Sequence, residues 1–192
     1  MMLRRRTVLT KGAVVLGFML MLLPQHASGK GGVFNNSVTI NTGLYAAEGF
    51  GSNLYVGGRY NHYFEKWKYF VETSVGYSSM RSQVLRDLAN FQVFDTENLW
   101  TYEFILGYDM SPLRNFPYLL TGVAGISQGG QFKFAYVIGL GKQIPLAQFF
   151  KVKRLGLRYD IRDQIFKQQV TNTAKAFIAH NLIFTIGLQY YF

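Results

Sequence analysis

Apolar and polar side chains alternate with a period of two along most of this chain. Residues 182–192 give the clearest case, because every even position there is a large apolar or aromatic residue, whereas the odd positions are mostly small or polar. Successive side chains of a strand point to opposite faces of a sheet. The pattern therefore predicts a β-strand with one apolar face.

The same alternation recurs in eight segments, which predicts eight strands. They span residues 38–46, 53–64, 68–78, 98–110, 117–127, 131–142, 154–165 and 181–192. In strand after strand one face is uncharged, and charged residues stand on the other. Those charged residues are Arg59, Glu72, Glu103, Asp109, Lys133, Arg158, Asp160 and Arg162. Only the segment 117–127 is ambiguous, because Leu119 and Val123 compete with Tyr118 for the apolar face.

Aromatic residues near the strand ends decide which face points outward. Alternation alone does not separate a soluble barrel, with its apolar face inside, from a membrane barrel, with that face outside. With the apolar face outward, the rings form two belts, as at the two interfaces of a membrane. One belt comprises Tyr60, Tyr69, Tyr108, Tyr118, Tyr190 and Phe192, and the other comprises Tyr77, Trp100, Tyr102 and Phe132.

The length and number of the strands complete the fold prediction. Strands of about 9–11 residues suit a tilted crossing of a bilayer, and in lipid no strand edge can remain unpaired. We therefore predict an all-β fold, an eight-stranded antiparallel transmembrane β-barrel in an up-and-down meander. An even number of strands places both ends of the barrel on one side, and the two longest connections, 79–97 and 166–180, fall on the other.

The first 29 residues have the three-part pattern of a cleavable secretory signal peptide. A basic start is followed by the uncharged apolar run 13–23, then by Pro24 and by small residues at 27 and 29. An apolar run of this length is too short for a spanning helix, which needs about 20 residues. The predicted organisation is a signal peptide over 1–29 and one barrel domain over 30–192.

Composition narrows the class of protein further. The chain has 20 Lys+Arg and 10 Asp+Glu, and the predicted signal removes four basic residues, which leaves a net charge of 16 − 10 = +6. A basic domain would suggest nucleic acid, but export argues against it, and no nucleic acid partner is expected. There is no Cys, which excludes disulfides and thiolate metal sites. The predicted location is the bacterial outer membrane, with both mature ends in the periplasm.

The stripe Arg158-x-Asp160-x-Arg162 is the strongest polar feature. Spacing by two puts the three side chains on the inward face. One interpretation is a charged pore or ligand site, and the other is an ion network that plugs the barrel. Eight strands leave room only for side chains, which favours the plug. Matching of depths along the strands predicts Glu72 as a partner for Arg158 and Glu103 as a partner for Arg162.

Catalytic and metal-binding patterns are weak. Neither His62 nor His180 has an adjacent serine, although Asp163 and His180 could meet at the outer rim with a serine from a loop. Asp95 and Glu97 could hold Ca²⁺, but two carboxylates without a third ligand are usually just solvated. No phosphate loop or zinc motif is present. We expect no cofactor, no metal and no enzymatic activity.

A family resemblance supports the barrel prediction. The chain reads LRYDIRDQIF over 157–166, then His180-Asn181, then FTIGL over 184–188 and a terminal aromatic residue. This resembles the small outer-membrane β-barrel domain family of myxobacteria and related proteobacteria. The resemblance implies a barrel in the outer membrane and little chemistry. The closing strand also resembles those of outer-membrane barrels, which implies that Leu188, Tyr190 and Phe192 act as an assembly signal.

The expected function is a structural scaffold or docking component of the Gram-negative cell envelope. Its expected partners are outer-membrane lipid and lipopolysaccharide, the barrel-assembly machinery, and envelope proteins that would bind the loops 79–97 and 166–180. Three alternatives remain open: a narrow, porin-like channel for small solutes or ions, a lipid-modifying enzyme at the rim, and a soluble ligand-binding barrel with its apolar face inward.

Overall fold

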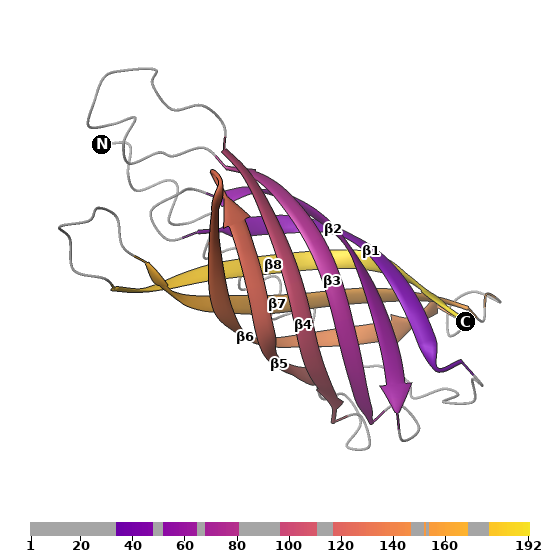
Figure 1. Cartoon of the computed structure of the whole chain (residues 1–192). Helices are drawn as coiled ribbons and strands as arrows, with labels where there is room; N and C mark the ends of the chain where they lie inside the picture. The colour runs from indigo at the N-terminus through magenta and orange to yellow at the C-terminus, as the bar shows by residue number, and fades with distance from the viewer. Residues whose placement is uncertain are drawn as a thin grey trace, which may run out of the picture.

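The protein is a closed antiparallel barrel of eight strands, seen here in a computed structural model (Figure 1). The structure describes residues 34–47, 52–64, 68–80, 97–110, 117–146, 152, 154–168 and 177–192. The strands are β1 (Asn36–Ala46), β2 (Ser52–Phe64), β3 (Tyr69–Met80), β4 (Glu97–Asp109), β5 (Tyr118–Gln128), β6 (Gln131–Pro145), β7 (Leu155–Gln168) and β8 (Phe177–Tyr191). The all-β fold, the strand number and the up-and-down meander are confirmed.

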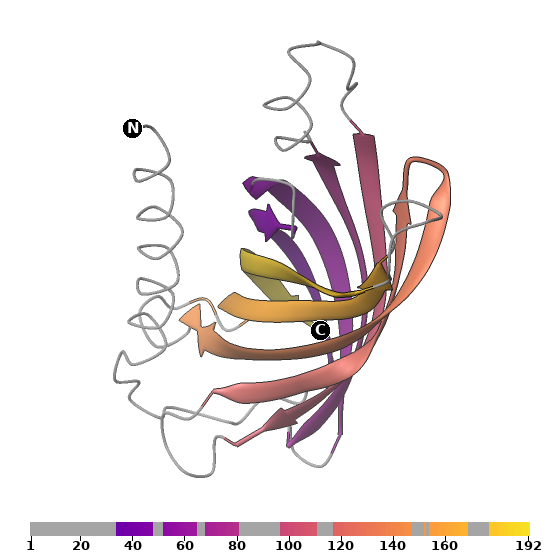
Figure 2. The same ribbon diagram turned by 90° about the vertical axis from the view of Figure 1, so that its left-hand side faces the viewer.

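Pairing between the first and last strands closes the sheet. β1 pairs with β8 from Ser37↔Tyr191 to Ala46↔Leu182, and each other strand pairs with its neighbours in sequence. The backbones of Asn36 and Phe192 also exchange two hydrogen bonds, so the start of β1 and the end of β8 meet at one end of the barrel (Figures 1 and 2). We call this end the lower end, and the opposite one the upper end.

The distribution of side chains is inside out relative to a soluble barrel. Large apolar residues alternate outward along the strands; Ile40 is 75% exposed and Phe134 is 79% exposed. The inward positions instead hold buried charged, amide and hydroxyl side chains together with tyrosines. This is the arrangement that a lipid environment favours, because apolar side chains face the surroundings and polar groups are paired inside.

Glycines give inward-facing rings the room they need. A Cβ added at Gly76 would lie 1.8 Å from the Tyr55 hydroxyl, and one added at Gly107 would lie 2.0 Å from the Phe70 ring. Each ring on one strand therefore covers a glycine on the next strand, and a side chain at the glycine would collide with it. The bore is filled by rings that these glycines accommodate.

The structure corrects the prediction for strand five. Tyr118 was predicted to lie outward in an aromatic belt, but it points into the lumen and is 2% exposed. Leu119 and Val123 are the outward residues instead. The cause lies in the composition of β5, which has no charged residue to mark its inward face.

The connection between β7 and β8 is shorter than predicted, because these two strands extend into the segment 166–180. Residues 81–96 and 169–176, the central parts of the two expected binding loops, lie outside the described residues, as does the predicted signal peptide 1–29.

No helix among the described residues is long and apolar enough to cross a bilayer.

Candidate functional site in the lumen

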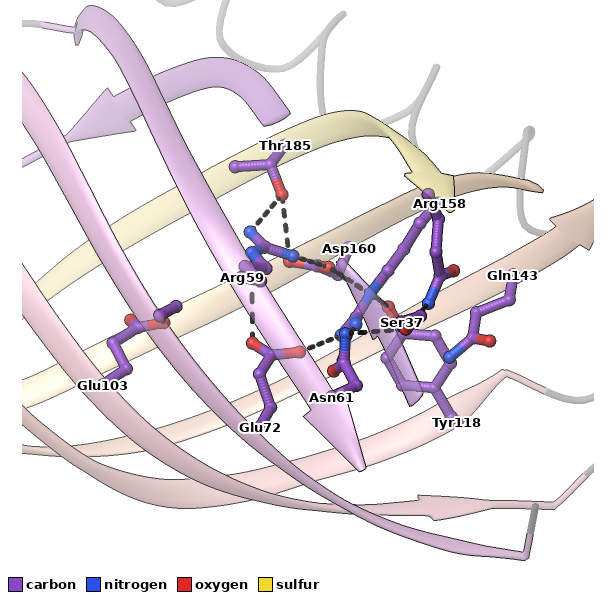
Figure 3. Close-up of polar contacts among 12 residues, drawn as sticks. Ser37, Arg59, Asn61, Glu72, Glu103, Tyr118, Gln143, Arg158, Asp160 and Thr185 are labelled. Carbon is purple, nitrogen blue, oxygen red and sulfur yellow. Dashed lines mark hydrogen bonds and ion pairs between the residues drawn. The ribbon is translucent and has the colours of Figure 1, made fainter. Parts of the chain in front are cut away.

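Six charged side chains from four strands meet inside the barrel. Figure 3 labels all of them except Arg162. β7 contributes three of them at alternate positions, as the period of a strand requires. β2, β3 and β4 contribute one each from the opposite wall. We call this set the ion network: Arg59, Glu72, Glu103, Arg158, Asp160 and Arg162.

Glu72 and Asp160 bridge the arginines of the network. Glu72 lies 2.6 Å from Nη2 of Arg158, 2.6 Å from Nη2 of Arg162 and 3.9 Å from Nε of Arg59. Asp160 accepts a hydrogen bond of 2.9 Å from Nε of Arg162, lies 3.4 Å from Nε of Arg158 and pairs with Nη1 of Arg59. Each of the two carboxylates therefore contacts all three guanidinium groups.

Glu103 connects the ion network to the upper part of the lumen. It pairs with Nη1 of Arg162 and accepts hydrogen bonds from Ser74, at 2.9 Å, and from the Gln164 amide, at 2.7 Å. Gln164 in turn accepts a hydrogen bond of 3.1 Å from the Tyr45 hydroxyl.

The lower part of the lumen is closed by amides and hydroxyls. Asn61 accepts a 2.9 Å bond from Nη1 of Arg158 and donates to Ser37. The amide nitrogen of Gln189 bonds Ser37 at 2.6 Å and the Tyr63 hydroxyl at 2.7 Å. Polar contacts thus run without a break from the ion network to the lower layer of the lumen.

Burial makes the charge balance of the network important. The side chains of the ion network are at most 2% exposed. Three guanidinium groups face three carboxylates, so the net charge of the ionised set is zero. Desolvating an ion is costly, and only close pairing with further hydrogen bonds offsets that cost. The guanidinium groups are thus engaged with protein carboxylates rather than held ready for a ligand.

Two polar side chains of β1 differ from the rest of the lumen. Thr39 and Asn41 are buried, but the hydroxyl of one and both amide atoms of the other have no hydrogen-bond partner among the described residues. Buried polar groups are usually paired with protein or with water.

Two residues expected with the network lie apart from it. Asp109 ends β4, at the lower end, and is only partly buried. Lys133 lies near the start of β6, at the upper end, with its ammonium 5.6 Å from the centre of the Phe166 ring. Both stand in the inward phase of their strands, but their positions at the ends put them far from the six central charges.

The other rings of the two predicted belts lie outward or partly exposed near the strand ends. At the lower end Tyr69 packs on Tyr108 with ring centres 5.2 Å apart, and at the upper end Tyr77 packs on Trp100 at 5.0 Å. The exposed members of the belts are Tyr60, Tyr69, Trp100, Tyr102, Phe132, Tyr190 and Phe192. Leu188 and Tyr190 lie on the outward face of β8, and Phe192, one residue beyond the end of this strand, is also exposed.

Sequence reasoning missed the inward tyrosines and amides that fill the lumen with the ion network. Tyr45, Tyr55 and Tyr63 are buried, and the Tyr55 hydroxyl lies 3.1 Å from that of Thr101. The signal was present in the alternation, because each of these residues stands in the inward phase of its strand. Their polarity is moderate, however, and only the charged positions were singled out.

The histidines, and the acids outside the ion network, provide little evidence for a catalytic or metal-binding site. Nδ1 of His62 lies 2.8 Å from Oδ1 of Asn36, an oxygen that can only accept a hydrogen bond. At the upper rim Nδ1 of His180 lies 2.7 Å from Asp163, so these two residues do meet. Among the described residues, no group of three or more His, Asp or Glu side chains could hold a metal ion.

Comparison with solved structures places the fold. Neisserial surface protein A (NspA) matches with a TM-score of 0.52 and 14% sequence identity, covering 82% of this chain and 97% of that chain. The outer membrane protein OprG from Pseudomonas aeruginosa matches with a TM-score of 0.55 and 10% identity, covering 85% and 98%. No family model matches the sequence, and no curated protein matches it. At such identities the likeness concerns the fold, which is that of the small eight-stranded outer-membrane β-barrels.

Proposed function

We propose that this chain is an integral outer-membrane β-barrel with a structural or docking role and a lumen closed by side chains. The observation that carries the proposal is the ion network, which spans the bore between β7 and the opposite wall with balanced charge. A bore of eight strands has little space beyond what such side chains occupy. The barrel then serves to hold its outer surfaces in the membrane rather than to pass a solute.

The membrane location rests on the outward face. Apolar side chains cover the middle of the barrel, and aromatic rings gather near its two ends. We place the lower end, with both ends of the barrel domain, in the periplasm, and we expect the assembly machinery to recognise the outward residues of β8. Fractionated envelopes should show the mature protein in the outer membrane, with faster gel migration before boiling than after. Recovery as a soluble periplasmic protein would refute the location.

Conductance tests the closed lumen. Purified protein reconstituted in planar bilayers should give no steady single-channel currents, because the network blocks the bore. The double variant Arg158→Ala with Arg162→Ala removes two of the large side chains and should increase leakage if it folds. Large steady currents from the unchanged protein would contradict the closed lumen and support a channel.

A narrow channel is the alternative that a specific observation favours. The unpaired polar atoms of Thr39 and Asn41 are suited to bind water inside the lumen. A single row of water molecules along β1 would conduct protons or small ions weakly. This path would run beside the arginines of the ion network and would not cross the network itself. Asn41→Leu should then reduce the current that the unchanged protein carries. If the lumen is closed, neither the unchanged protein nor this variant should carry a steady current.

A lipid-modifying enzyme at the rim is a weaker alternative. It is supported by the contact between His180 and Asp163, the pair that would orient a general base. Mass spectrometry of lipids from envelopes that overproduce the protein should show no new species, and the His180→Ala variant should give the same lipid profile. A modified lipid that disappears in that variant would favour the enzyme.

We propose that the outer loops bind other envelope proteins, in keeping with the resemblance of residues 157–166 to a barrel family of myxobacterial type. Crosslinking in intact envelopes should capture a partner through the segments 79–97 or 166–180. Capture that persists after both loops are shortened would locate the docking surface elsewhere.

A further inference from the structure

An arginine at the lower rim has a fixed position and unused hydrogen-bond donors. Arg154 directly precedes β7 and is exposed. Its Nη1 donates a 3.2 Å bond to the Tyr190 hydroxyl, and its guanidinium carbon lies 5.0 Å from the centre of the Phe34 ring. A guanidinium has five donors, so most remain available for an acceptor outside the barrel. No carboxylate of the described residues forms an ion pair with it.

A shallow apolar groove lies on the outer wall above this arginine. Its volume is about 380 Å³ and it crosses β2, β1, β8 and β7. The outward residues that line it are Ile40, Thr42, Val56, Leu157, Ile186 and Leu188. The groove exists because Thr42 is small and stands between Val56 and Ile186, its partners on the two neighbouring strands.

The floor of the groove is backbone. Asn41, Gly57 and Gly187 also line it, but they belong to the inward phase of their strands, so they meet the groove through main-chain atoms. The Thr42 hydroxyl donates a 3.2 Å bond to the carbonyl of Tyr55, which satisfies the one polar side chain of the groove. The space therefore suits a hydrocarbon chain.

The register connects the cation to the groove. Tyr190, which bonds Arg154, pairs with Leu155, and the next outward pair up the barrel is Leu157↔Leu188, part of the groove. From Arg154 to Leu157 is about 10 Å along the strand, at about 3.3 Å per residue. This is the order of groups in a membrane lipid, with a charged head at the interface and chains above it.

We propose that the seam between β7, β8 and β1 binds one anionic phospholipid. The Arg154 guanidinium holds the phosphate, since its planar fork matches phosphate oxygens. One acyl chain lies in the groove over Thr42. The inference rests on the proposed membrane location and adds a lipid class and a site to it.

Native mass spectrometry of the purified full chain in detergent tests the site. We would titrate it with phosphatidylglycerol, with phosphatidylcholine of the same acyl chains, and with glycerol phosphate, which has no chains. One phosphatidylglycerol should bind in preference to both other compounds. Arg154→Gln should weaken that binding about tenfold, the loss of a charge-assisted contact. Thr42→Trp, which fills the groove from outside, should weaken it to a similar extent.

Lys68→Gln is the matched control. Lys68 also lies at the lower end, next to the rings of Tyr69 and Tyr108, but it precedes β3, which does not line the groove. The Lys68→Gln variant should bind phosphatidylglycerol with the same affinity as the unchanged protein. Equal loss in Lys68→Gln and Arg154→Gln, or equal affinity for the two lipids, would overturn the site.

Gel migration before and after boiling distinguishes a failure of the proposed lipid site from a failure of the proposed membrane barrel. A protein that folds as a heat-modifiable barrel but shows no preference for phosphatidylglycerol refutes the lipid site and leaves the membrane barrel standing. A chain that never shows the compact band contradicts the membrane barrel itself.

Discussion

Glu72 is the residue on which most of the buried charge depends. Its two oxygens lie within 3.9 Å of all three guanidinium groups of the ion network, and its side chain is fully buried. A carboxylate in this position is stable only while cations surround it. The main contribution of each arginine of the network to stability is therefore to neutralise the buried acids.

Arg158→Ala should destabilise the barrel by about 3–5 kcal/mol, because it leaves the three buried carboxylates of the network with only two arginines to neutralise them. Equilibrium refolding in phospholipid vesicles over a urea gradient measures the change. The double variant Arg158→Met with Glu72→Gln removes one charge of each sign, so its loss should be smaller than the sum of the losses in Arg158→Met alone and Glu72→Gln alone. Simple additivity would show that the two side chains do not interact.

Close contact between rings and glycines provides a second test at single positions. Gly76→Ala places a methyl group against the Tyr55 ring, and overpacking of this kind costs about 1–3 kcal/mol. The combination with Tyr55→Leu should recover part of the loss. Gly58→Ala is the control, because nothing lies within 4 Å of the added atom. Equal effects in the two glycine variants would argue against ring packing as the cause.

At the scale of the strand, charge determines how reliably a phase can be assigned from sequence. β7 has charged side chains at alternate positions, so its inward face was unambiguous. β5 has apolar residues on both faces and no charge, so Tyr118 was placed in a belt although it bonds Asp160 inside the barrel. The inward orientation of Tyr118 is stabilised by that hydrogen bond and by the packing of the tyrosine ring. Both involve residues of other strands, so the sequence of β5 alone does not reveal them.

Arginine substitutions along β5 test the corrected phase. Val123 is near the middle of the strand, and Leu119 lies beside Tyr108 at the lower end. Val123→Arg should destabilise by about 2–4 kcal/mol in lipid, whereas Leu119→Arg should cost about 0–1 kcal/mol, because the penalty falls toward the interface. Refolding in vesicles gives both values. If the two changes had the same effect, β5 would not cross the membrane as assigned.

At the scale of the whole molecule, closure joins all eight strands into one unit. Every strand has a partner on both sides, and the ion network links β7 to β2, β3 and β4 across the bore. No strand can leave without breaking two ladders of hydrogen bonds and, in lipid, exposing them. We would therefore expect the barrel to unfold as a whole.

Unfolding by urea in vesicles should give coincident transitions by tryptophan fluorescence and by far-ultraviolet circular dichroism, as for a two-state protein. The Arg158→Ala variant should shift both curves together. A fluorescence transition well before loss of the strand signal would indicate that part of the barrel opens separately.

The fold could be predicted from the sequence because a single rule, alternation with period two, applies to every strand and the lipid requires closure. The placement of Asp109 and Lys133 could not, since alternation gives the face of a residue but not its depth. Matching of depths along the strands did predict the pairs Arg158–Glu72 and Arg162–Glu103, and both contacts are present. It did not predict the additional contacts of Glu72 with Arg162 and Arg59, which depend on the register between strands. The inward phase of the lumen tyrosines could be read from the alternation, but the close contact of the Tyr55 ring with Gly76 on the next strand could not.

The charges of the ion network are divided unequally along the chain, and this has a consequence for biogenesis. β2, β3 and β4 together contribute one cation and two anions, a sum of −1, whereas β7 contributes two cations and one anion, a sum of +1. A half-built sheet that contains only the earlier strands would therefore hold an excess negative charge on its concave side. Arrival of β7 cancels that excess across contacts that span 59 to 101 residues of sequence. Contacts of such range form late, so the final hairpin completes both the wall and the electroneutrality of the interior in one step.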